Sequence, residues 1–312
     1  MTSRGVRVVI LLATYDGAAF LPEQLASIAA QDHADWSLIW RDDGSADDSV
    51  AIMQRFAAAQ PAGRVARLAA PAGHVGSAAG FLALLRHAAT TMGAHDVVAF
   101  ADQDDVWLPF KLSRAVRSLS DAAADGPAIY AARQILVDTR LHHLAVSARL
   151  TAPPIFPAAL TQNLATGCTM ALNRAAALLV AGSTAPPGCQ HDWWAYILVT
   201  AAGGQFIADD EPVVLYRQHG GNAVGAPRSL ARRGLAALRR GPGPFMAQMR
   251  RNVVALDAQR HLLTPQAGQQ VDVIKAALAG GVLHRLHVLR VGGLCRQTRS
   301  EQMLFRLWFM FG

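Results

Sequence analysis

The sequence predicts an α/β fold, in which helices cover a sheet of largely buried strands. Over roughly the first 130 residues, continuous apolar runs typical of buried strands alternate with helix-like segments. This alternation is typical of α/β sheets. Several of the apolar runs end abruptly in acidic residues, as in ATYDG, RDDGS and ADQDD. Because ligands of such sheets bind at the carboxyl ends of the strands, the acidic ends predict a ligand site.

The expected elements follow one another in a regular order. The first strand is expected over residues 7–13 and the next helix over 20–31, with Pro22 suited to a first helical turn. Ser45 and Asp48 fit a capping box for a second helix over 46–60. Further strands are expected over 36–42, 64–70, 96–102, 127–137 and 206–216, and further helices over 77–92, 108–119 and 191–203.

The chain is expected to divide near residue 225 into a strand–helix domain over 1–225 and a basic, helical region over 226–312. From Arg228 onward the sequence has 14 Lys and Arg against 3 Asp and Glu, whereas residues 1–227 have 15 against 19. Residues 232–245 are typical of a linker or mobile loop because Arg, Gly and Pro are frequent there. The basic end of the chain predicts an anionic partner.

Three interpretations of this basic region are open: binding to nucleic acid, binding to an anionic membrane, or packing against the body of the protein. Nucleic acid is not expected, because no stacking or groove-reading motif accompanies the charge. An anionic membrane surface is favoured, with Trp308, Phe309 and Phe311 in the lipid interface and Arg side chains reaching the headgroups. The alternative is a helical appendage that packs Leu and Val on the body and leaves its Arg side chains in water.

The composition favours a cytoplasmic protein without a membrane span. No apolar run reaches about 18 residues, the length that a transmembrane helix needs. The apolar run near the N-terminus is short and lacks a small-residue cleavage site, so we interpret it as a strand. Cys168, Cys189 and Cys295 are too few and too scattered for a disulfide framework or a zinc site, which fits a reducing compartment.

Three carboxylates crowd together after the expected strand over 96–102. Like charges at Asp102, Asp104 and Asp105 raise one another's pKa, so they need a cation, hydrogen-bond donors or water. Asp102 and Asp104 are two residues apart and can point into one space, which suits Mg²⁺ or Mn²⁺. The alternative is a solvated acidic turn, in which Asp105 caps the helix over 108–119.

Three further groups carry side chains of chemical interest. One carboxylate of Asp42 and Asp43, at the end of a strand, can accept a hydrogen bond from a nucleobase, although a turn explains them equally well. Asp192 begins an aromatic helix, where it either stabilises the helix dipole or acts as a general base in an apolar pocket. Arg217 and His219 are two apart, so we expect them on one face of a strand, near a diphosphate or its metal.

Six motifs in this order resemble family 2 glycosyltransferases with the GT-A fold, and in detail their bacterial rhamnosyltransferase branch. The resemblance covers roughly residues 6–225, and only the loop PAGHVGSAAGF (71–81) follows the branch loosely. The motifs are ATYDG (13–17), RDDGSADDS (41–49), ADQDDVWLPFKL (101–112), NLATGCTMALNR (163–174), HDWW (191–194) and YRQHGGN (216–222). Each motif is weak alone, but the six in the family order are specific together.

The resemblance implies a GT-A-like, Rossmann-like nucleotide-binding mixed sheet flanked by helices, with a helical basic C-terminal appendage. It implies an inverting transfer of a sugar to a hydroxyl of a cell-surface polysaccharide or lipid-linked acceptor, on the inner face of the cell membrane. The expected donor is dTDP-rhamnose, with UDP- and GDP-sugars as alternatives. A divalent metal, Mg²⁺ or Mn²⁺, is expected beside the donor.

The resemblance also implies a role for individual residues. The nucleotide pocket is expected to include Thr14, Tyr15 and Asp16, with Asp43 and Asp42 at the base. Asp102 and Asp104 form the D-x-D pair, in which Asp104 is the more direct metal ligand. Asp192 is the expected catalytic base, and Gly167–Thr169 the wall near donor and acceptor. Arg217 and His219 close over the diphosphate, with His219 on the metal.

Two other functions, nucleotidyl transfer and a non-catalytic scaffold, are alternatives to glycosyl transfer. A nucleotidyltransferase needs a glycine-rich loop with Lys or Arg directly after the first strand, and LLATYDGAAF has none. A non-catalytic, membrane-associated scaffold of the same fold is disfavoured because Asp104, Asp192 and His219 are all present. A decayed site would have lost at least one of them.

Overall fold

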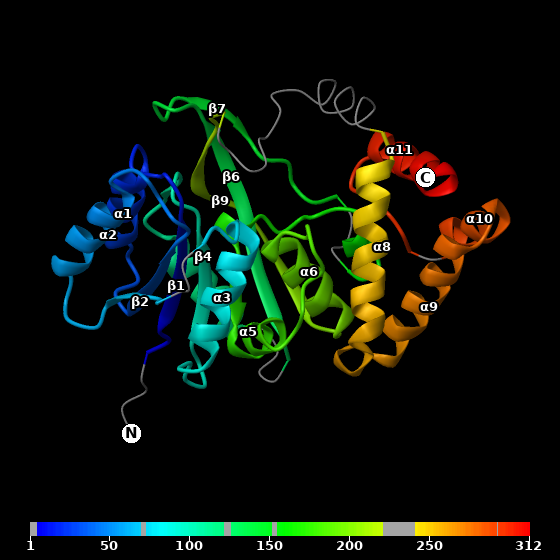
Figure 1. Ribbon diagram of the computed structural model, residues 1–312, viewed down its shortest axis with the longest axis horizontal. Coiled ribbons are helices and arrows are strands. Elements are labelled where there is room, and N and C mark those ends of the chain that lie inside the picture. The colour runs from blue at the N-terminus through cyan, green and yellow to red at the C-terminus, as the bar shows by residue number, and fades with distance from the viewer. Residues whose placement is uncertain (1–4, 70–72, 122–125, 152–154, 221–240, 292) are drawn as a thin grey trace.

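The computed structural model describes residues 5–69, 73–121, 126–151, 155–220, 241–291 and 293–312 (Figure 1). Its strands are β1 (Val8–Thr14), β2 (Trp36–Asp42), β3 (Val65–Arg67), β4 (Val97–Ala101), β5 (Val106–Trp107), β6 (Ala128–Val137), β7 (His143–Val146), β8 (Ala171–Asn173) and β9 (Gln205–Arg217). Its α-helices are α1 (Leu21–Ala29), α2 (Ser49–Ala58), α3 (Ser77–Ala89), α4 (Lys111–Ser120), α5 (Arg174–Ala181), α6 (His191–Ala201), α8 (Gly243–Ala258), α9 (Pro265–Ala279), α10 (Val282–Val291) and α11 (Arg299–Phe311). Short 3₁₀ turns are η1 (Ala158–Leu160), η2 (Gly167–Thr169) and η3 (Arg260–Leu262).

The strands form one mixed sheet in the order β3-β2-β1-β4-β8-β6-β9-β5, with β7 paired to β6 beside this path. β1 pairs in parallel with both β2 and β4, and β2 pairs in parallel with β3. β8 is antiparallel to both β4 and β6, so it joins the parallel N-terminal half to the parallel pair β6 and β9. The α/β class and the mixed sheet predicted from the sequence are confirmed.

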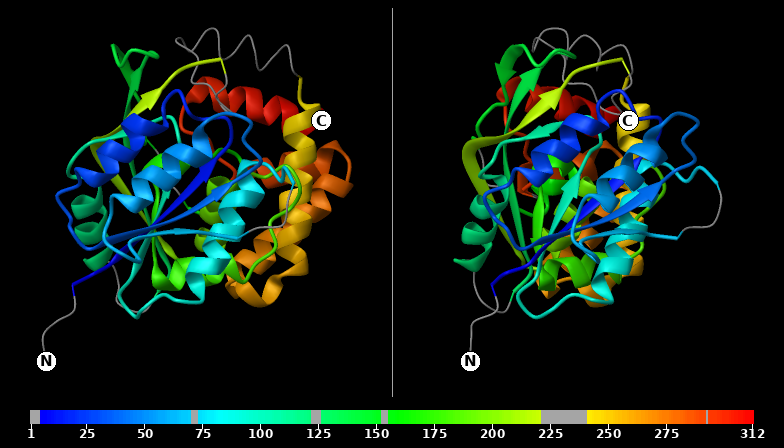
Figure 2. Two further views of the ribbon diagram at one scale, coloured as in Figure 1. Left: turned by 60° about the vertical axis from the view of Figure 1, so that its left-hand side comes forward. Right: turned by 90° about the vertical axis from the view of Figure 1, so that its left-hand side faces the viewer.

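The alternation of side chains along β1 explains why helices cover both faces of the sheet. Val8, Ile10 and Leu12 are buried against α1, α2 and α4, whereas Val9 and Leu11 are buried against α3, α5 and α6. A strand that is apolar on both faces is stable only between two helical layers. Figure 2 shows the sheet between these helical layers.

The expected strands agree closely with β1, β2, β4, β6 and β9, whereas two local expectations are wrong. The third strand is only Val65–Arg67, shorter than the predicted 64–70. The capping box is absent: Asp48 precedes α2 without a side-chain cap, and the Ser45 hydroxyl donates instead to Asp42. Pro22 does occupy the first turn of α1, as predicted.

The C-terminal region is helical, and its helices share a core with the body of the protein. Met249 of α8 and Phe305 of α11 are buried in the same apolar cluster as Trp194 of α6. The expected boundary near residue 225 and most of the expected loop over 232–245 lie outside the described residues. None of the helices in the described ranges is long and apolar enough to span a bilayer.

The proposed lipid contact of Phe309 is wrong, because its side chain is fully buried between α11 and the rest of the core. Trp308 is half-buried and packs against Phe245 at a ring-centroid distance of 5.8 Å. Phe311, in contrast, is 75% exposed. The aromatic end of the chain is therefore divided between the core and the surface.

One ion pair fastens α4 to the sheet. The Asp209 carboxylate of β9 accepts two hydrogen bonds from the Arg114 guanidinium, both 2.8 Å, and one of 2.8 Å from the Tyr130 hydroxyl. Burial raises the Asp209 pKa, but these donors outweigh it and hold the pKa below its ordinary value of 3.8.

We predict that Asp209→Asn lowers the free energy of unfolding by about 2 kcal/mol at neutral pH, because charge-assisted hydrogen bonds are lost. This contribution is complete above the ordinary pKa and is lost as the pH falls through the lower folded-state pKa, so the two proteins converge in acid. Urea unfolding between neutral and acid pH measures it. Asp210→Asn is the control, since its carboxylate is exposed; equal losses in both variants would contradict the assignment.

Candidate active site

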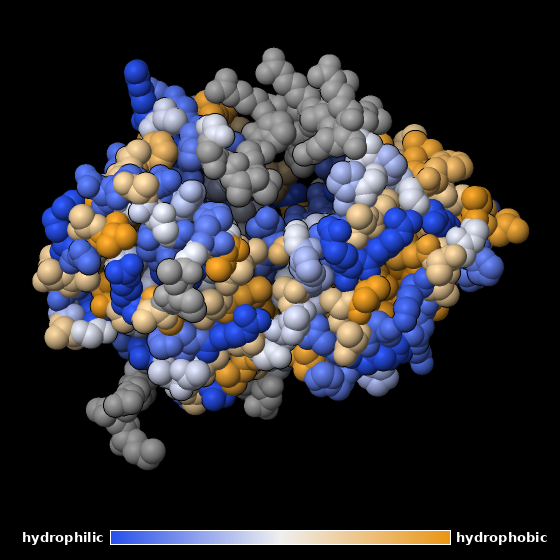
Figure 3. Space-filling view, in the orientation of Figure 1, coloured by the Kyte–Doolittle hydropathy of each residue, from blue (hydrophilic) through white to orange (hydrophobic). Residues whose placement is uncertain are grey.

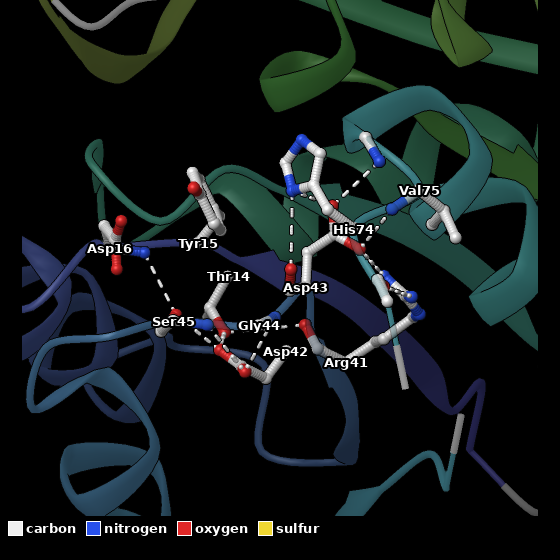
Figure 4. Close-up of polar contacts among 12 residues, drawn as sticks. Thr14, Tyr15, Asp16, Arg41, Asp42, Asp43, Gly44, Ser45, His74 and Val75 are labelled. Carbon is white, nitrogen blue, oxygen red and sulfur yellow. Dashed lines mark hydrogen bonds and ion pairs between the residues drawn. The ribbon is translucent and has the colours of Figure 1, made fainter. Parts of the chain in front are cut away.

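The loops after β1 and β2 are joined by side-chain hydrogen bonds at the carboxyl edge of the sheet (Figure 4). The Thr14 hydroxyl donates to Asp42 Oδ1 at 3.1 Å. The Asp16 backbone N–H donates to the Ser45 hydroxyl at 3.0 Å, and Asp16 Oδ1 accepts from the Ala46 N–H at 2.7 Å. The structure thus brings Thr14, Asp16 and Asp42 together, as the motifs suggested.

Asp42 has the environment of a turn-forming residue. Its two oxygens accept four hydrogen bonds: from the Thr14 and Ser45 hydroxyls and from the Gly44 and Ser45 N–H groups. Burial raises its pKa, but these donors, Ser45 first, lower it below its ordinary value. The turn alternative weighed for Asp42 accounts for all four contacts.

Asp43 is buried and fully bonded. Its Oδ1 accepts from the Arg41 guanidinium at 2.5 Å and from the Val75 N–H at 2.9 Å. Its Oδ2 accepts from the Gly76 N–H at 2.8 Å and lies 3.0 Å from His74 Nδ1. Burial raises the Asp43 pKa, but the Val75 and Arg41 donors keep it below its ordinary value. Asp43 is therefore an ionised carboxylate at ordinary pH.

His74 is a site residue that the motifs did not predict. Its imidazole lies 4.6 Å from the Tyr15 ring, centroid to centroid, and both rings are exposed beside Asp43 (Figure 4). Two exposed aromatic rings above a buried carboxylate offer a stacking surface and a hydrogen-bond acceptor to a planar heterocycle. The sequence does contain a signal for this residue: the glycine-rich segment GHVG carries a His to which none of the six motifs gives a role.

Gln103 connects the β4 turn to the β1 loop. Its side-chain amide accepts from the Tyr15 N–H and donates to the Tyr15 carbonyl, both at 2.9 Å. A Cβ on Gly17 would lie 2.2 Å from Gln103 Oε1, so only glycine allows this approach. The middle residue of D-Q-D thus holds the two acidic loops together.

Asp104 and His219 are in direct contact. His219 Nε2 lies 2.8 Å from Asp104 Oδ2, and both side chains are largely buried. His219 follows the end of β9, so the expectation that it shares a strand face with Arg217 is wrong. The two residues nevertheless meet at Asp104, because the Arg217 guanidinium donates to the Asp104 carbonyl at 2.9 Å.

Asp102 shows the effect of crowded charge at this edge. Burial, with the negative charges of Asp104 and Asp192, raises its pKa to about 7. The expected repulsion within D-x-D is therefore present. The direct contact is between Asp104 and His219, whereas an Asp102 oxygen lies within 4.8 Å of the ligand atoms of Asp105 and Cys168. A carboxylate oxygen and an imidazole nitrogen are ligand atoms that fit Mn²⁺ or Mg²⁺.

Arg217 is almost fully buried, and its guanidinium organises the site. Besides the Asp104 carbonyl it binds the Thr139 carbonyl at 2.6 Å and the Glu23 carboxylate, and it lies 4.7 Å over the Phe20 ring. These contacts tie β9 to the start of α1 and to the D-x-D turn. The expected contact of Arg217 with a diphosphate stays a prediction.

A buried cluster beneath the D-x-D turn was not predicted. Oxygens of Asp102 and Asp105 and the Cys168 sulfur lie within 4.8 Å of one another. The Asp105 carboxylate also accepts from the Arg217 N–H at 3.2 Å, so Asp105 does not cap α4, whose N-cap is Phe110. Buried Lys111, whose Nζ lies 3.6 Å from the Trp107 ring centroid, lowers the pKa of Asp102 by its charge.

Asp192 lies in the first turn of α6 and is nine-tenths buried. Its Oδ2 accepts from the Gly167 N–H at 2.9 Å and its Oδ1 from the Trp193 N–H at 2.6 Å. Gly167 begins η2, so the expected wall is in contact with the expected base. Each oxygen keeps a second lone pair, so the carboxylate can still accept a proton.

Comparison with known proteins agrees with this geometry. Residues 9–179 match the model of the family described as Glycosyl transferase family 2. The dTDP-rhamnosyl transferase RfbG of Shigella flexneri is 27% identical over 231 residues, 69% of this chain and 74% of that protein.

Solved structures resemble the fold. S. aureus TarS 1–349 in complex with UDP-GlcNAc has a TM-score of 0.59 at 15% identity, covering 96% of this chain and 78% of TarS 1–349. The same protein with UDP has a TM-score of 0.59 at 12% identity, covering 97% and 90%. These likenesses concern the fold, and they confirm the GT-A-like architecture expected from the sequence.

We predict that Asp43→Asn lowers the free energy of unfolding by about 3 kcal/mol without any ligand, because it leaves buried Arg41 without its counter-charge. Asp48→Asn, at an exposed carboxylate of the same loop, should change stability by less than about 0.5 kcal/mol. Thermal unfolding of both variants measures this. An Asp43→Asn protein as stable as the wild type would show that the ion pair between Arg41 and Asp43 does not contribute to stability.

Proposed function

Because this chain belongs to glycosyl transferase family 2, we propose that it is an inverting transferase that moves L-rhamnose from dTDP-rhamnose to an acceptor hydroxyl. The observation that carries the proposal is the contact of Asp104 with His219, where two motifs that are distant in the sequence meet at the strand ends. The rhamnosyl donor is supported by the likeness to the dTDP-rhamnosyl transferase of Shigella flexneri. A UDP- or GDP-sugar is the alternative donor.

The nucleoside would bind at the ends of β1 and β2. Tyr15 and His74 offer aromatic faces to the base, while Thr14, Asp16 and Asp43 surround its edge. Asp43 can accept a hydrogen bond from a base N–H only if one of its present hydrogen-bond partners moves away. His74 is the partner that can leave most easily, since its side chain is 60% exposed. The donor is therefore expected to displace His74 from Asp43.

Asp104, Asp102 and His219 would hold a divalent cation, Mg²⁺ or Mn²⁺, which supplies positive charge opposite the donor diphosphate. Burial and the neighbouring carboxylates raise the Asp102 pKa to about 7, and a cation held there would favour the ionised form of Asp102. Arg217 keeps the Asp104 turn in place, since its guanidinium binds the Asp104 carbonyl and the Glu23 carboxylate.

Asp192 would act as the base. The acceptor hydroxyl gives its proton to an Asp192 oxygen while the hydroxyl oxygen forms a bond to the anomeric carbon. The bond between this carbon and the phosphate oxygen breaks on the opposite face, and its electron pair leaves with the nucleoside diphosphate. A single displacement of this kind inverts the anomeric centre. The hydrogen bond from the Gly167 N–H fixes the direction of the carboxylate.

The acceptor would be a cell-surface polysaccharide or a lipid-linked saccharide, and the enzyme would work on the cytoplasmic side, at the inner face of the cell membrane. The three cysteines of the chain are free, and two of them are buried, which suits a reducing compartment. A non-catalytic scaffold of the same fold is the competing proposal, and the variants below separate the two.

We predict that Asp104→Asn reduces metal-dependent transfer by at least about a hundredfold, since a carboxylate charge aimed at the developing diphosphate is lost. The amide keeps a hydrogen-bonding partner for His219, so the loop should stay in place. Transfer assays over a range of Mn²⁺ concentrations measure the effect, with Asp121→Asn at the exposed end of α4 as control. Full activity of Asp104→Asn would remove Asp104 from the metal site.

We predict that Asp192→Asn binds donor and metal like the wild type but loses a factor of about 10² to 10⁴ in turnover. The asparagine oxygen still accepts from the Gly167 N–H, so the change removes basicity with little change of shape. Calorimetric donor binding and steady-state turnover separate the two effects. Loss of donor binding would give Asp192 a binding role, and unchanged turnover would support the scaffold.

A further inference from the structure

Helix α11 presents an apolar stripe to solvent although its opposite side is buried. Phe305 and Phe309 are fully buried, whereas Met303, Leu307 and Phe311 are 67%, 55% and 75% exposed. The exposed three are spaced by four residues, so they lie along one side of the helix. Exposed large side chains in such a row, unlike single ones, mark an interaction surface.

Helix α10 lies beside the end of α11. The Arg285 guanidinium donates to the carbonyls of Phe309 at 3.2 Å and Gly312 at 2.8 Å. Leu283 of α10 is 79% exposed, and since it is two residues from Arg285 it lies on a different side of α10 from the contact with α11. Hydrophobic surface is visible over α10 and α11 at the upper right of Figure 3. We call Met303, Leu307 and Phe311, together with the exposed Leu283, the α10–α11 stripe.

Basic side chains accompany the stripe. Arg299 and Arg306 of α11 and Arg290 of α10 are exposed. Of the three acidic residues of 241–312, two are paired between α8 and α9, and the third, Glu301, lies on α11 itself. Asp257 is bonded to Arg260 and Lys275, and Asp272 to Arg260, between α8 and α9. Glu301 accepts from the Thr298 hydroxyl at the start of α11.

We propose that the α10–α11 stripe docks on an anionic phospholipid surface, with its apolar side chains among the acyl chains and its arginines at the headgroups. Arginine has a long apolar stem and a charged head, which suits the boundary between the acyl chains and the headgroups. A second copy of the chain is a poorer occupant. In a symmetric pair Arg299 and Arg306 would face a surface that carries the same positive charges.

This surface would also orient the active site, a consequence that rests on the proposed function. Figure 1 shows α11 at the same end of the molecule as the carboxyl ends of β1, β4, β6 and β9. A bilayer held by α11 would therefore lie on the side of the molecule where the acidic loops are. The acceptor class favoured by this arrangement is a saccharide carried on a membrane lipid.

The test is co-sedimentation of the full chain with phosphatidylglycerol-rich vesicles and with pure phosphatidylcholine vesicles. The wild type should bind the anionic vesicles more tightly, and salt at about 0.5 M should weaken the binding. Arg299→Gln with Arg306→Gln should weaken it about 25-fold, because each arginine contributes about fivefold. Arg117→Gln, an exposed arginine on α4, is the matched control and should bind like the wild type.

The apolar part is tested with Met303→Ser, Leu307→Ser and Phe311→Ser together, which should weaken binding to anionic vesicles by at least about tenfold. Val254→Ser, 59% exposed on α8, is the control. Unchanged thermal unfolding of every variant confirms that these exposed positions do not affect folding.

Two results would overturn the proposal. One is wild-type binding that does not exceed that of the phosphatidylcholine control. The other is a concentration-dependent dimer in sedimentation velocity that the triple serine variant abolishes, which would assign the stripe to a second copy. These measurements use neither donor nor acceptor. They therefore test membrane binding even if the proposed transferase activity is wrong.

Discussion

The structure depends on how the carboxylates at the ends of β1, β2 and β4 are compensated. Parallel pairing of these strands brings their carboxyl ends to one edge, so Asp16, Asp42, Asp43 and Asp102 come together. Crowded negative charge is unfavourable unless each group finds donors or a cation. Asp42 and Asp43 obtain donors from the loops and from Arg41. These bonds shape the loops that a nucleotide would meet.

The D-x-D turn is compensated only in part. Arg217 binds its backbone and Lys111 lies beneath it, yet the pKa of Asp102 remains near 7. Repulsion among Asp102, Asp104 and Asp192 is therefore part of the environment of this turn. Burying the charged side chains of Arg217 and Lys111 costs free energy, so stability alone does not explain this turn. Under the proposed function, this turn would serve to bind a metal and a diphosphate.

Much of the frame was predictable from local pattern, whereas the surroundings of the site were not. β1, β2 and β4 were predicted because apolar runs of the right length stand between turn signals. The short strands β5, β7 and β8 were missed because their pairing is set by distant partners and leaves little local pattern. The motif residues around Thr14, Asp43, Asp102 and Asp104 do gather at one edge. His74 was missed because its contact with Asp43 joins two loops that are distant in the sequence. The proximity of Lys111 and Cys168 to Asp102 and Asp105 was missed because burial beside a distant strand cannot be read from neighbouring residues. The roles of Arg217 and Phe309 depend on the same tertiary packing.

The most direct test is calorimetric titration of the protein with dTDP, UDP and GDP, each with and without Mn²⁺. Such binding stabilises the folded state in proportion to affinity, so thermal unfolding provides a second readout. The account predicts tight, Mn²⁺-dependent binding of dTDP and weaker binding of the other two. Tighter binding of UDP or GDP would keep the mechanism and replace the donor. Absence of binding by all three would contradict a preformed nucleotide site at the strand ends.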